Sequence, residues 1–134
     1  APVLGVCYWA RQGEGAFKDG ERLPLKTTEN RTTYKIVASR SHMSNETQGF
    51  IDSIQTIKEK EIISIGSSLK MCLVAEGEVD IYPRLAPTME WDTGAAHAIV
   101  SEAGGSIMQY KSKKSQTYNK ESLLNEWFLA IAPN

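Results

Sequence analysis

The chain lacks the features that mark several specialised classes of protein. Its only two cysteines, Cys7 and Cys72, form no C-x-x-C pair and have no metal-site spacing, so both are expected to be small buried hydrophobes, as suits a reducing compartment. No apolar run approaches the roughly 18 to 20 residues of a membrane span. The opening residues 1–6 contain no initiator Met and no charged n-region. We expect neither a signal peptide nor a natural start there, and the chain should begin within a fold.

There is also no excess of charge of one sign. Fifteen Lys and Arg residues face sixteen Asp and Glu residues, which leaves a net charge of −1. This balance argues against a protein that holds DNA or RNA through phosphate neutralisation. The content of 41% hydrophobic and 23% charged residues is that of an ordinary soluble globular chain. With no repeat, linker or low-complexity tract, residues 1–134 should form a single domain, and charge and cysteine use favour a cytoplasmic location.

Alternation of short apolar runs with helical patterns predicts an α/β layered fold. Strands are expected at residues 3–9, 34–39, 61–65, 79–85, 106–110 and 128–132, with the first of them buried. Phe50, Ile51, Ile54 and Ile57 recur at helical spacing, which predicts a helix over residues 46–58. Further helices should run from an N-cap at Ser67 to about residue 76 and from Asp92 to about residue 103. Asp19-Gly20 predicts a tight turn between short strands.

Familiar active-site templates are missing. The sequence has no G-x-S-x-G elbow, no phosphate-binding G-x-x-x-x-G-K-[ST] loop and no full G-x-G-x-x-G. Gly13-Glu14-Gly15 lacks the third glycine and is expected to belong to a turn. The two histidines, His42 and His97, are far apart and lack cysteine partners, so a zinc site is not expected. His97 should be a surface or half-buried helix residue.

Three polar clusters stand where a predicted strand meets a loop or helix, which is where open α/β sheets bind ligands. The clusters are residues 39–42, residues 66–70, and Arg84 together with residues 90–96. Taken alone, they are a solvated loop, a serine N-cap and an aspartate cap. In the second cluster, however, a helix start with Lys70 one turn on could hold a phosphate. In the third, Asp92 beside three small residues could meet a divalent cation that bridges to a phosphate.

Residues 91–105, WDTGAAHAIVSEAGG, resemble the C-terminal signature of the inositol monophosphatase superfamily. Residues 65–77 (IGSSLKMCLVAEG), 80–84 (DIYPR) and 118–125 (YNKESLLN) are similar to its CysQ branch, the 3′(2′),5′-bisphosphate nucleotidases. The resemblance covers essentially the whole chain. It implies an α/β layered sheet-and-helix sandwich, the C-terminal half of the inositol monophosphatase fold.

The resemblance also implies a function and a set of site residues. The family consists of Mg²⁺-dependent, lithium-sensitive phosphomonoesterases, and the CysQ branch removes the 3′-phosphate of adenosine 3′,5′-bisphosphate, or of its sulfated relative, in sulfate assimilation. By the family pattern, Asp92 would be a ligand of the Mg²⁺ cofactor. His42, Ser67, Lys70 and Arg84 resemble the positions that hold the nucleotide and its 5′-phosphate. Lysine and arginine suit this task as counter-charges to phosphate.

The sequence departs from the family in one respect. The motif D-P-[IL]-D-G-[ST], which supplies most metal ligands and the hydroxyl that orients the attacking water, does not occur. Residues 3–6 resemble the strand that follows this motif, so the chain resembles the C-terminal part of the enzyme. One carboxylate cannot assemble a two-metal site. We therefore expect the isolated chain to be inactive or nearly so and to bind Mg²⁺ weakly if at all, and we expect an unpaired sheet edge that favours a homo-oligomer.

Three alternatives stay open at this point. The chain could belong to an inositol monophosphatase or fructose-1,6-bisphosphatase type of sugar phosphatase, although residues 66–70 and 83–84 favour the nucleotidase. It could be a non-catalytic module that binds nucleotide phosphate or a protein partner, as the missing motif suggests. A structural α/β domain without a ligand is the third alternative.

Overall fold

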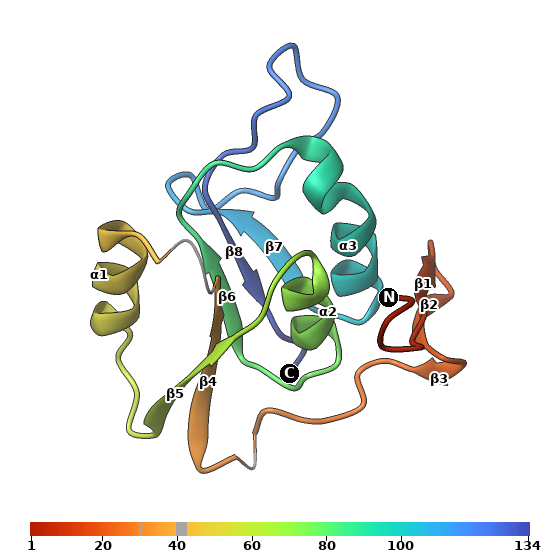
Figure 1. Cartoon of the computed structure of the whole chain (residues 1–134), viewed down its shortest axis with the longest axis horizontal. Coiled ribbons are helices and arrows are strands. Elements are labelled where there is room, and N and C mark those ends of the chain that lie inside the picture. The colour runs from red at the N-terminus through yellow and green to blue at the C-terminus, as the bar shows by residue number, and fades with distance from the viewer. Residues whose placement is uncertain (30, 40–42) are drawn as a thin grey trace.

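The computed structural model describes residues 1–29, 31–39 and 43–134 (Figure 1). None of the helices in these residues is long and apolar enough to cross a membrane. The α/β class is confirmed. The elements are, in chain order, β1 (Tyr8–Arg11), β2 (Gly15–Lys18), β3 (Glu21–Arg22), β4 (Thr33–Ala38), α1 (Asn45–Ser53), β5 (Glu59–Ser64), α2 (Leu69–Ala75), β6 (Ile81–Arg84), α3 (Glu90–Glu102), β7 (Ser106–Gln109) and β8 (Phe128–Ile131).

The larger sheet has five strands in the order β5-β4-β6-β8-β7. Strands β5, β4 and β6 run parallel, whereas β8 is antiparallel to both β6 and β7. Side chains of a strand alternate between the two faces of a sheet. Accordingly, Ile36 and Val37 of β4 are both fully buried but belong to two different apolar clusters. Both faces of this sheet are therefore covered.

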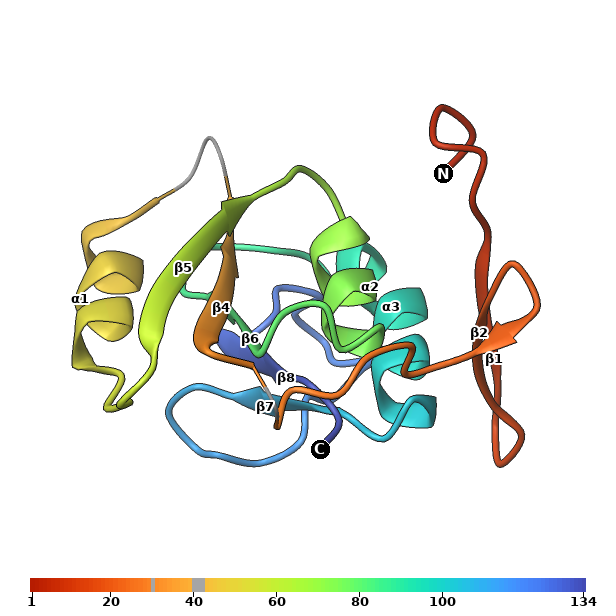
Figure 2. The ribbon, with the colours of Figure 1, turned by 90° about the horizontal axis from the view of Figure 1, so that it is seen from below.

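The helices and the two sheets form four layers. Helices α2 and α3 pack on one face of the larger sheet, around Val37, Tyr82 and Phe128, and α1 packs on the other face through Ile51. Figures 1 and 2 show the order α1, five-stranded sheet, α2 with α3, and finally the small sheet β1-β2-β3. This arrangement is the layered sheet-and-helix sandwich that the sequence predicts.

The small sheet is attached to α2 and α3 by polar contacts. Glu102, the last residue of α3, accepts the backbone N–H groups of Gly13 and Gly15 at 3.1 Å. The Tyr8 hydroxyl donates to Glu76 at 2.5 Å. Asp19 and Gly20 both have positive φ and join β2 to β3, so the predicted tight turn is confirmed.

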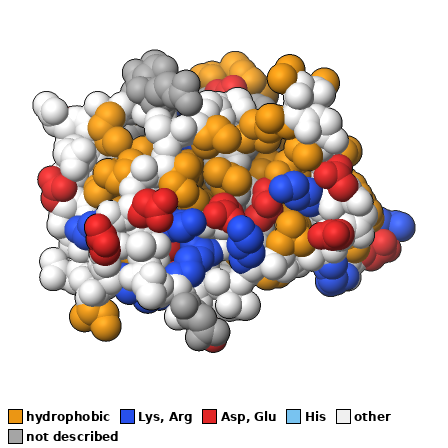
Figure 3. Space-filling view, turned by 60° about the horizontal axis from the view of Figure 1, so that its bottom comes forward, with side chains coloured by type: hydrophobic (Ala, Val, Ile, Leu, Met, Phe, Trp, Pro, Cys, Tyr) orange, Lys and Arg blue, Asp and Glu red, His pale blue; other side chains and the backbone are white. Residues whose placement is uncertain are grey.

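The segment between β3 and β4 is held by ion pairs. Lys26 pairs with Glu78, which also pairs with Lys35 of β4, and Arg31 lies 3.4 Å from Asp80. On the face seen in Figure 3, acidic and basic side chains are interspersed and lie next to apolar side chains. This face therefore carries charges of both signs and has no broad region of one sign.

The predicted buried strand at residues 3–9 is wrong. The strand β1 begins only at Tyr8, residues 2–5 form a turn, and Val3 and Leu4 are 99% and 60% exposed. Cys7 is exposed, contrary to expectation, whereas Cys72 is buried as predicted, and both thiols are free. Apolar composition alone does not bury a segment when no neighbouring strand or face in the described residues covers it.

The predicted helix over residues 46–58 is too long. Helix α1 ends at Ser53, Ile54 is extended, and the side chain of Ile57 is fully exposed. The Lys60 ammonium of β5 donates to the carbonyl oxygens of Ile51 at 2.7 Å and Asp52 at 3.1 Å. This ammonium supplies hydrogen-bond donors to carbonyl oxygens near the helix end. Hydrophobic periodicity does not reveal such a contact.

Candidate functional site

The candidate site lies where the three parallel strands end. Ser39 follows β4, Gly66 and Ser67 follow β5, and Arg84 is the last residue of β6. Because these strands are parallel, their carboxyl ends meet at one edge of the sheet, which is where α/β sheets form ligand sites. The first turn of α3 completes a pocket of about 560 Å³. Its lining residues are Ser39, Gly66, Ser67, Ser68, Lys70, Met71, Tyr82, Arg84, Thr88, Trp91, Asp92, Thr93 and Phe128.

Four of the five residues that the sequence nominates thus lie in a single pocket. They are Ser67, Lys70, Arg84 and Asp92, which come from three different parts of the chain. The fifth, His42, lies outside the described residues. All three polar clusters nevertheless contribute to the pocket, because Ser39 of the first cluster lines it.

Lys70 places a buried cation at the floor of the pocket. Its side chain is only 5% exposed, and its Nζ donates to the carbonyl oxygens of Ser67 at 2.8 Å and Ile65 at 3.3 Å. The Nζ also lies 5.4 Å from the centre of the Tyr82 ring. Burial, and then the neighbouring charge of Arg84, lower the pKa of Lys70 below its usual value. An anion in the pocket would favour the charged form of Lys70 and offset the repulsion from Arg84.

Arg84 supplies the second positive charge. Its Nη2 donates to the carbonyl oxygen of Pro87 at 2.8 Å, which folds the guanidinium back over the turn after β6. Its Nε is buried and has no hydrogen-bond partner among the described residues. A buried donor without a partner is costly. A phosphate oxygen in the pocket is a chemically suitable acceptor for it.

Ser67 does not cap α2 as the sequence predicts. The helix begins two residues later at Leu69, its N-cap is Ser68, and no side chain makes the cap bond. Ser67 instead has a φ of 57°, and its Oγ is 3.5 Å from the N–H of Leu69. The left-handed backbone at Ser67 lets the chain turn sharply from β5 into α2, so the serine lies at the exposed rim of the pocket.

Asp92 is the third residue of α3, since the helix begins at Glu90 and not at Asp92 as predicted. Its Oδ2 accepts the backbone N–H of Met89 at 2.9 Å, so the carboxylate caps the helix start. The side chain is exposed and lines the pocket. Asp92 thus both caps α3 and lines the pocket.

The pocket does not hold a complete set of metal ligands. Asp92 is the only carboxylate among its lining residues, and no group of three or more His, Cys, Asp or Glu side chains within residues 1–29, 31–39 and 43–134 could hold a metal ion. Magnesium sites use oxygen ligands, and two-metal phosphatase sites need several carboxylates. The described residues alone therefore do not fit a two-metal centre.

Sequence reasoning missed part of the pocket wall. Tyr82 and Thr88 line the pocket but lie outside the three polar clusters. Trp91 and Thr93, which belong to the third cluster, also line it, and the Trp91 side chain is 68% exposed although tryptophan is highly buried on average. His97, by contrast, is half-buried in α3 as expected, and its Nδ1 lies 2.8 Å from the Tyr118 hydroxyl.

Comparison with known proteins gives a consistent result. The family model described as "Inositol monophosphatase family" matches residues 1–131. The chain is 42% identical to the 3′(2′),5′-bisphosphate nucleotidase CysQ of Salmonella typhimurium, over 96% of this chain and 51% of that protein. Its identity to the CysQ of Escherichia coli K12 is 40% over the same shares. The chain thus spans about half the length of these curated relatives.

Solved structures extend this similarity to three dimensions. The crystal structure of CysQ from Bacteroides thetaiotaomicron matches with a TM-score of 0.90 and 41% identity, over 99% of this chain and 56% of that one. An inositol monophosphatase from Staphylococcus aureus matches with a TM-score of 0.75 at 20% identity, over 96% of this chain and 47% of that one. At this lower identity, the likeness concerns the fold alone.

Proposed function

Because this chain belongs to the inositol monophosphatase family, we propose that it forms the C-terminal part of a phosphomonoesterase. The substrate of the whole enzyme is adenosine 3′,5′-bisphosphate or its sulfated relative, from which the 3′-phosphate is removed. The observation that carries the proposal is the gathering of Ser67, Lys70, Arg84 and Asp92 in one pocket. The relatives named 3′(2′),5′-bisphosphate nucleotidase support the choice of a nucleotide substrate.

The chemistry of the pocket suits a phosphate group. Lys70 and Arg84 provide two positive charges in a partly desolvated site, where charge-assisted hydrogen bonds to phosphate are strong. Two of the three N–H groups of the Lys70 ammonium are engaged with carbonyl oxygens, which leaves one for a ligand. The Ser67 hydroxyl at the rim can donate to a phosphate oxygen. By resemblance, His42 joins these residues in holding the nucleotide.

Magnesium is part of the proposal for the whole enzyme, with Asp92 as one ligand. The remaining ligands would come from a part of the whole enzyme that lies outside this chain, which spans only 51% of the curated relatives. By the family resemblance, that part is the N-terminal half. Since one carboxylate is not a metal centre, this chain alone should bind Mg²⁺ weakly if at all. The proposal also includes a role in sulfur metabolism and a cytoplasmic location, for which the two free thiols are suitable.

The test measures binding and hydrolysis separately on the chain as it is. Adenosine 3′,5′-bisphosphate should bind in calorimetry, whereas phosphate release in the presence of Mg²⁺ should not exceed background. Lys70→Met should weaken binding, and Lys111→Met, which changes an exposed lysine outside the pocket, should not. Failure of the wild-type chain to bind would contradict the proposed site. Turnover that disappears in Asp92→Asn would contradict the expectation of inactivity.

Two other functions remain to be separated from this one. A sugar phosphatase of the inositol monophosphatase type would bind inositol 1-phosphate in the same pocket, and competition between this compound and the bisphosphate distinguishes the two. A non-catalytic phosphate-binding module is favoured by the single carboxylate of the pocket. It would bind the bisphosphate without hydrolysis even after an N-terminal half from a relative is supplied, whereas the enzyme fragment would then gain activity.

A further inference from the structure

The direction of the Asp92 carboxylate depends on the residues just before α3. Its Oδ2 accepts the N–H of Met89 at 2.9 Å, and the N–H of Asp92 donates to the carbonyl oxygen of Met89 at 3.0 Å. Asp92 itself is exposed, so no surrounding core holds it in place. Whatever fixes the backbone of Met89 therefore also fixes where the carboxylate points into the pocket.

A second segment, residues 118–125, pairs with this backbone. We call it the clamp segment. Met89 and Leu124 form an antiparallel bridge, the N–H of Glu90 donates to Leu123 at 2.9 Å, and the N–H of Asn125 donates to Thr88 at 2.9 Å. The clamp segment thus pairs like a short strand with residues 88–90. None of its residues lines the phosphate pocket, so it does not contact a ligand there directly.

The side chain of Asn125 adds three contacts to this backbone pairing. It is 5% exposed, and its Nδ2 reaches the carbonyl oxygen of Met89 at 2.8 Å, Thr93 Oγ1 at 3.0 Å and Thr88 Oγ1 at 3.2 Å. A backbone carbonyl only accepts hydrogen bonds, so the contact with Met89 fixes which end of the amide faces α3. The three partners lie on both sides of Asp92 in the sequence, and two of them, Thr88 and Thr93, line the pocket.

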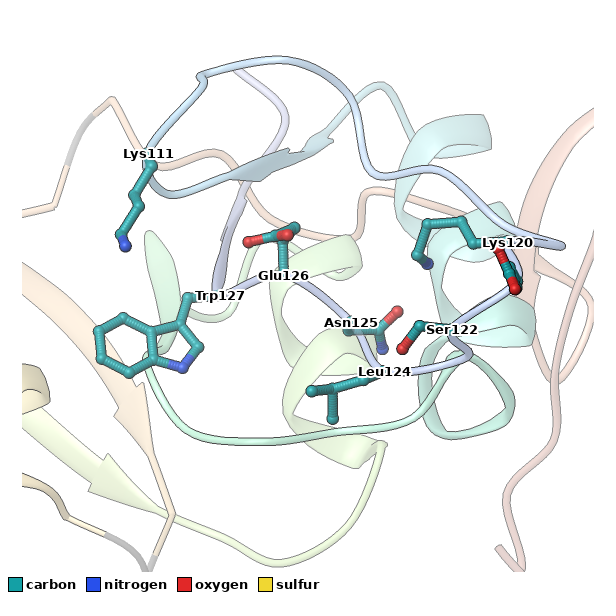
Figure 4. A pocket seen from close by; sticks show the side chains of 8 residues that line it. Lys111, Lys120, Ser122, Leu124, Asn125, Glu126 and Trp127 are labelled. Atoms are coloured by element: carbon teal, nitrogen blue, oxygen red, sulfur yellow. The ribbon is translucent and has the colours of Figure 1, made fainter.

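A second anchor lies at the other end of the clamp segment. The buried carboxylate of Glu90 accepts the N–H of Asn119 at 2.6 Å and pairs with the Lys120 ammonium. Figure 4 shows Asn125 near Ser122 and Lys120 at one end of a second pocket, whose other end carries Lys111 and Trp127. The Oδ1 of Asn125 has no hydrogen-bond partner among the described residues. The side chain of Asn125 therefore holds the start of α3 through its Nδ2.

We propose that Asn125 is a positioning residue, which holds the turn of residues 88–93 so that the Asp92 carboxylate and the pocket wall face the bound phosphate. This proposal rests on the proposed function only for the identity of the ligand. The geometric part, which is the dependence of the Met89–Asp92 bond on Asn125, can be tested without any ligand.

The first test is amide hydrogen exchange of the whole chain. In Asn125→Ala, protection of the Met89 amide should fall about tenfold relative to the amides of β4, because loss of the Asn125 bond destabilises one turn and not the core. Gln116→Ala is the matched control. Gln116 is equally buried and lies shortly before the clamp segment, but its backbone N–H donates to Ile107 of β7 and its side-chain amide has no partner among the described residues. Within the part of the chain that the structure describes, this variant removes no side-chain hydrogen bond and no hydrogen-bond contact with residues 88–90, so the protection of Met89 relative to β4 should stay as in the wild-type chain.

The second test is the affinity for adenosine 3′,5′-bisphosphate, measured by calorimetry at a temperature where the variants are folded. Asn125→Ala should weaken binding about fivefold to tenfold, whereas Gln116→Ala should leave it within about twofold. If Asn125→Ala does not fold, Asn125→Ser, which retains a shorter donor, should show the same pattern with a smaller amplitude.

The outcomes separate the two proposals. If the wild-type chain does not bind the bisphosphate, the proposed function fails, and hydrogen exchange still decides the role of Asn125. If Met89 in Asn125→Ala keeps its wild-type protection relative to β4, or loses protection only in parallel with β4, the positioning role is overturned. If Met89 loses protection selectively but affinity is unchanged, the turn does not determine phosphate binding and the proposal is equally overturned.

Discussion

Lys70 illustrates, at the scale of a single side chain, how a residue proposed to bind phosphate lowers the stability of the folded chain. Its ammonium is nearly buried and lies close to a second cation, Arg84, and both effects lower its pKa. In the unfolded chain this pKa returns to its usual value of 10.5. Between the two pKa values the unfolded state binds more protons, so the stability of the folded chain should rise with pH there. At neutral pH, the charge of Lys70 is therefore maintained at a cost in stability.

This situation predicts a pH dependence of ligand binding. A phosphate ligand needs the ammonium, so the affinity for adenosine 3′,5′-bisphosphate should decline as the pH rises through the lowered pKa of Lys70, earlier than for an ordinary lysine. Lys70→Met should lose about tenfold in affinity at pH 7. Lys70→Arg should remain charged and should not show the decline. Calorimetry between pH 7 and pH 10 measures all three chains.

An affinity that does not change with pH in the wild-type chain would contradict the role of Lys70. The control is again Lys111→Met, whose exposed ammonium lies outside the pocket. It should reproduce the wild-type pH profile.

At the scale of an element, α2 depends on the turn that ends it. The helix stops at Ala75, and Gly77 follows with a φ of 72°. The carbonyl oxygen of Glu76 accepts the N–H groups of Leu25 and Lys26, each at 3.0 Å, so the segment after β3 lies directly against this turn. A Cβ at Gly77 would lie 2.0 Å from the carbonyl oxygen of Lys26. Both conformation and space therefore require glycine there.

Gly77→Ala should accordingly destabilise the chain by about 3 kcal/mol or prevent folding, because backbone strain adds to a clash with the main chain. Gly49→Ala is the matched control. Gly49 lies within α1 and an added Cβ would meet nothing within 4 Å, so alanine should raise stability by about 0.5 to 1 kcal/mol. Thermal and urea unfolding of both variants measures this difference. A Gly77→Ala protein as stable as wild type would contradict the geometry of the turn.

At the scale of the whole molecule, one side of the fold is incompletely covered. Strand β1 has a partner on only one side within the described residues, and an apolar pocket of about 470 Å³ lies between residues 1–8 and helices α2 and α3. Val3 and Leu4, which are largely exposed, line it on one side. Leu69, Cys72 and Ile99 of the two helices line the other side. An unpaired edge beside exposed apolar side chains favours association.

We therefore predict that the chain self-associates through this side. In sedimentation velocity, the mean mass should increase with concentration, and Leu4→Asp should shift the equilibrium towards monomer. Ile57→Asp is the control, because Ile57 is fully exposed but does not line this pocket. A wild-type chain that remains a monodisperse monomer at high concentration would contradict the prediction.

The sequence by itself determined the layered α/β class, the family and most members of the pocket. Short apolar runs located β4, β6, β7 and β8 because buried strands need apolar side chains. Strand β5 has no buried residue, and the predicted range of residues 61–65 overlaps it only in part. The order of strands and helices then places the ends of the parallel strands at one edge. Residue chemistry pointed to the polar clusters that contain Ser67, Lys70, Arg84 and Asp92. The resemblance to the family singled out these four residues, and their common pocket is observed.

Only the tertiary structure decided where the elements end and what orients the site. Helix α1 ends at Ser53, and Lys60, from a later strand, satisfies the carbonyl oxygens of Ile51 and Asp52 near that end. Residues 3–7 are apolar but remain outside the sheets because no described neighbour covers them. The contact between Asn125 and the turn before Asp92 joins residues more than thirty positions apart. Such contacts depend on packing between distant segments, which local composition and periodicity do not encode.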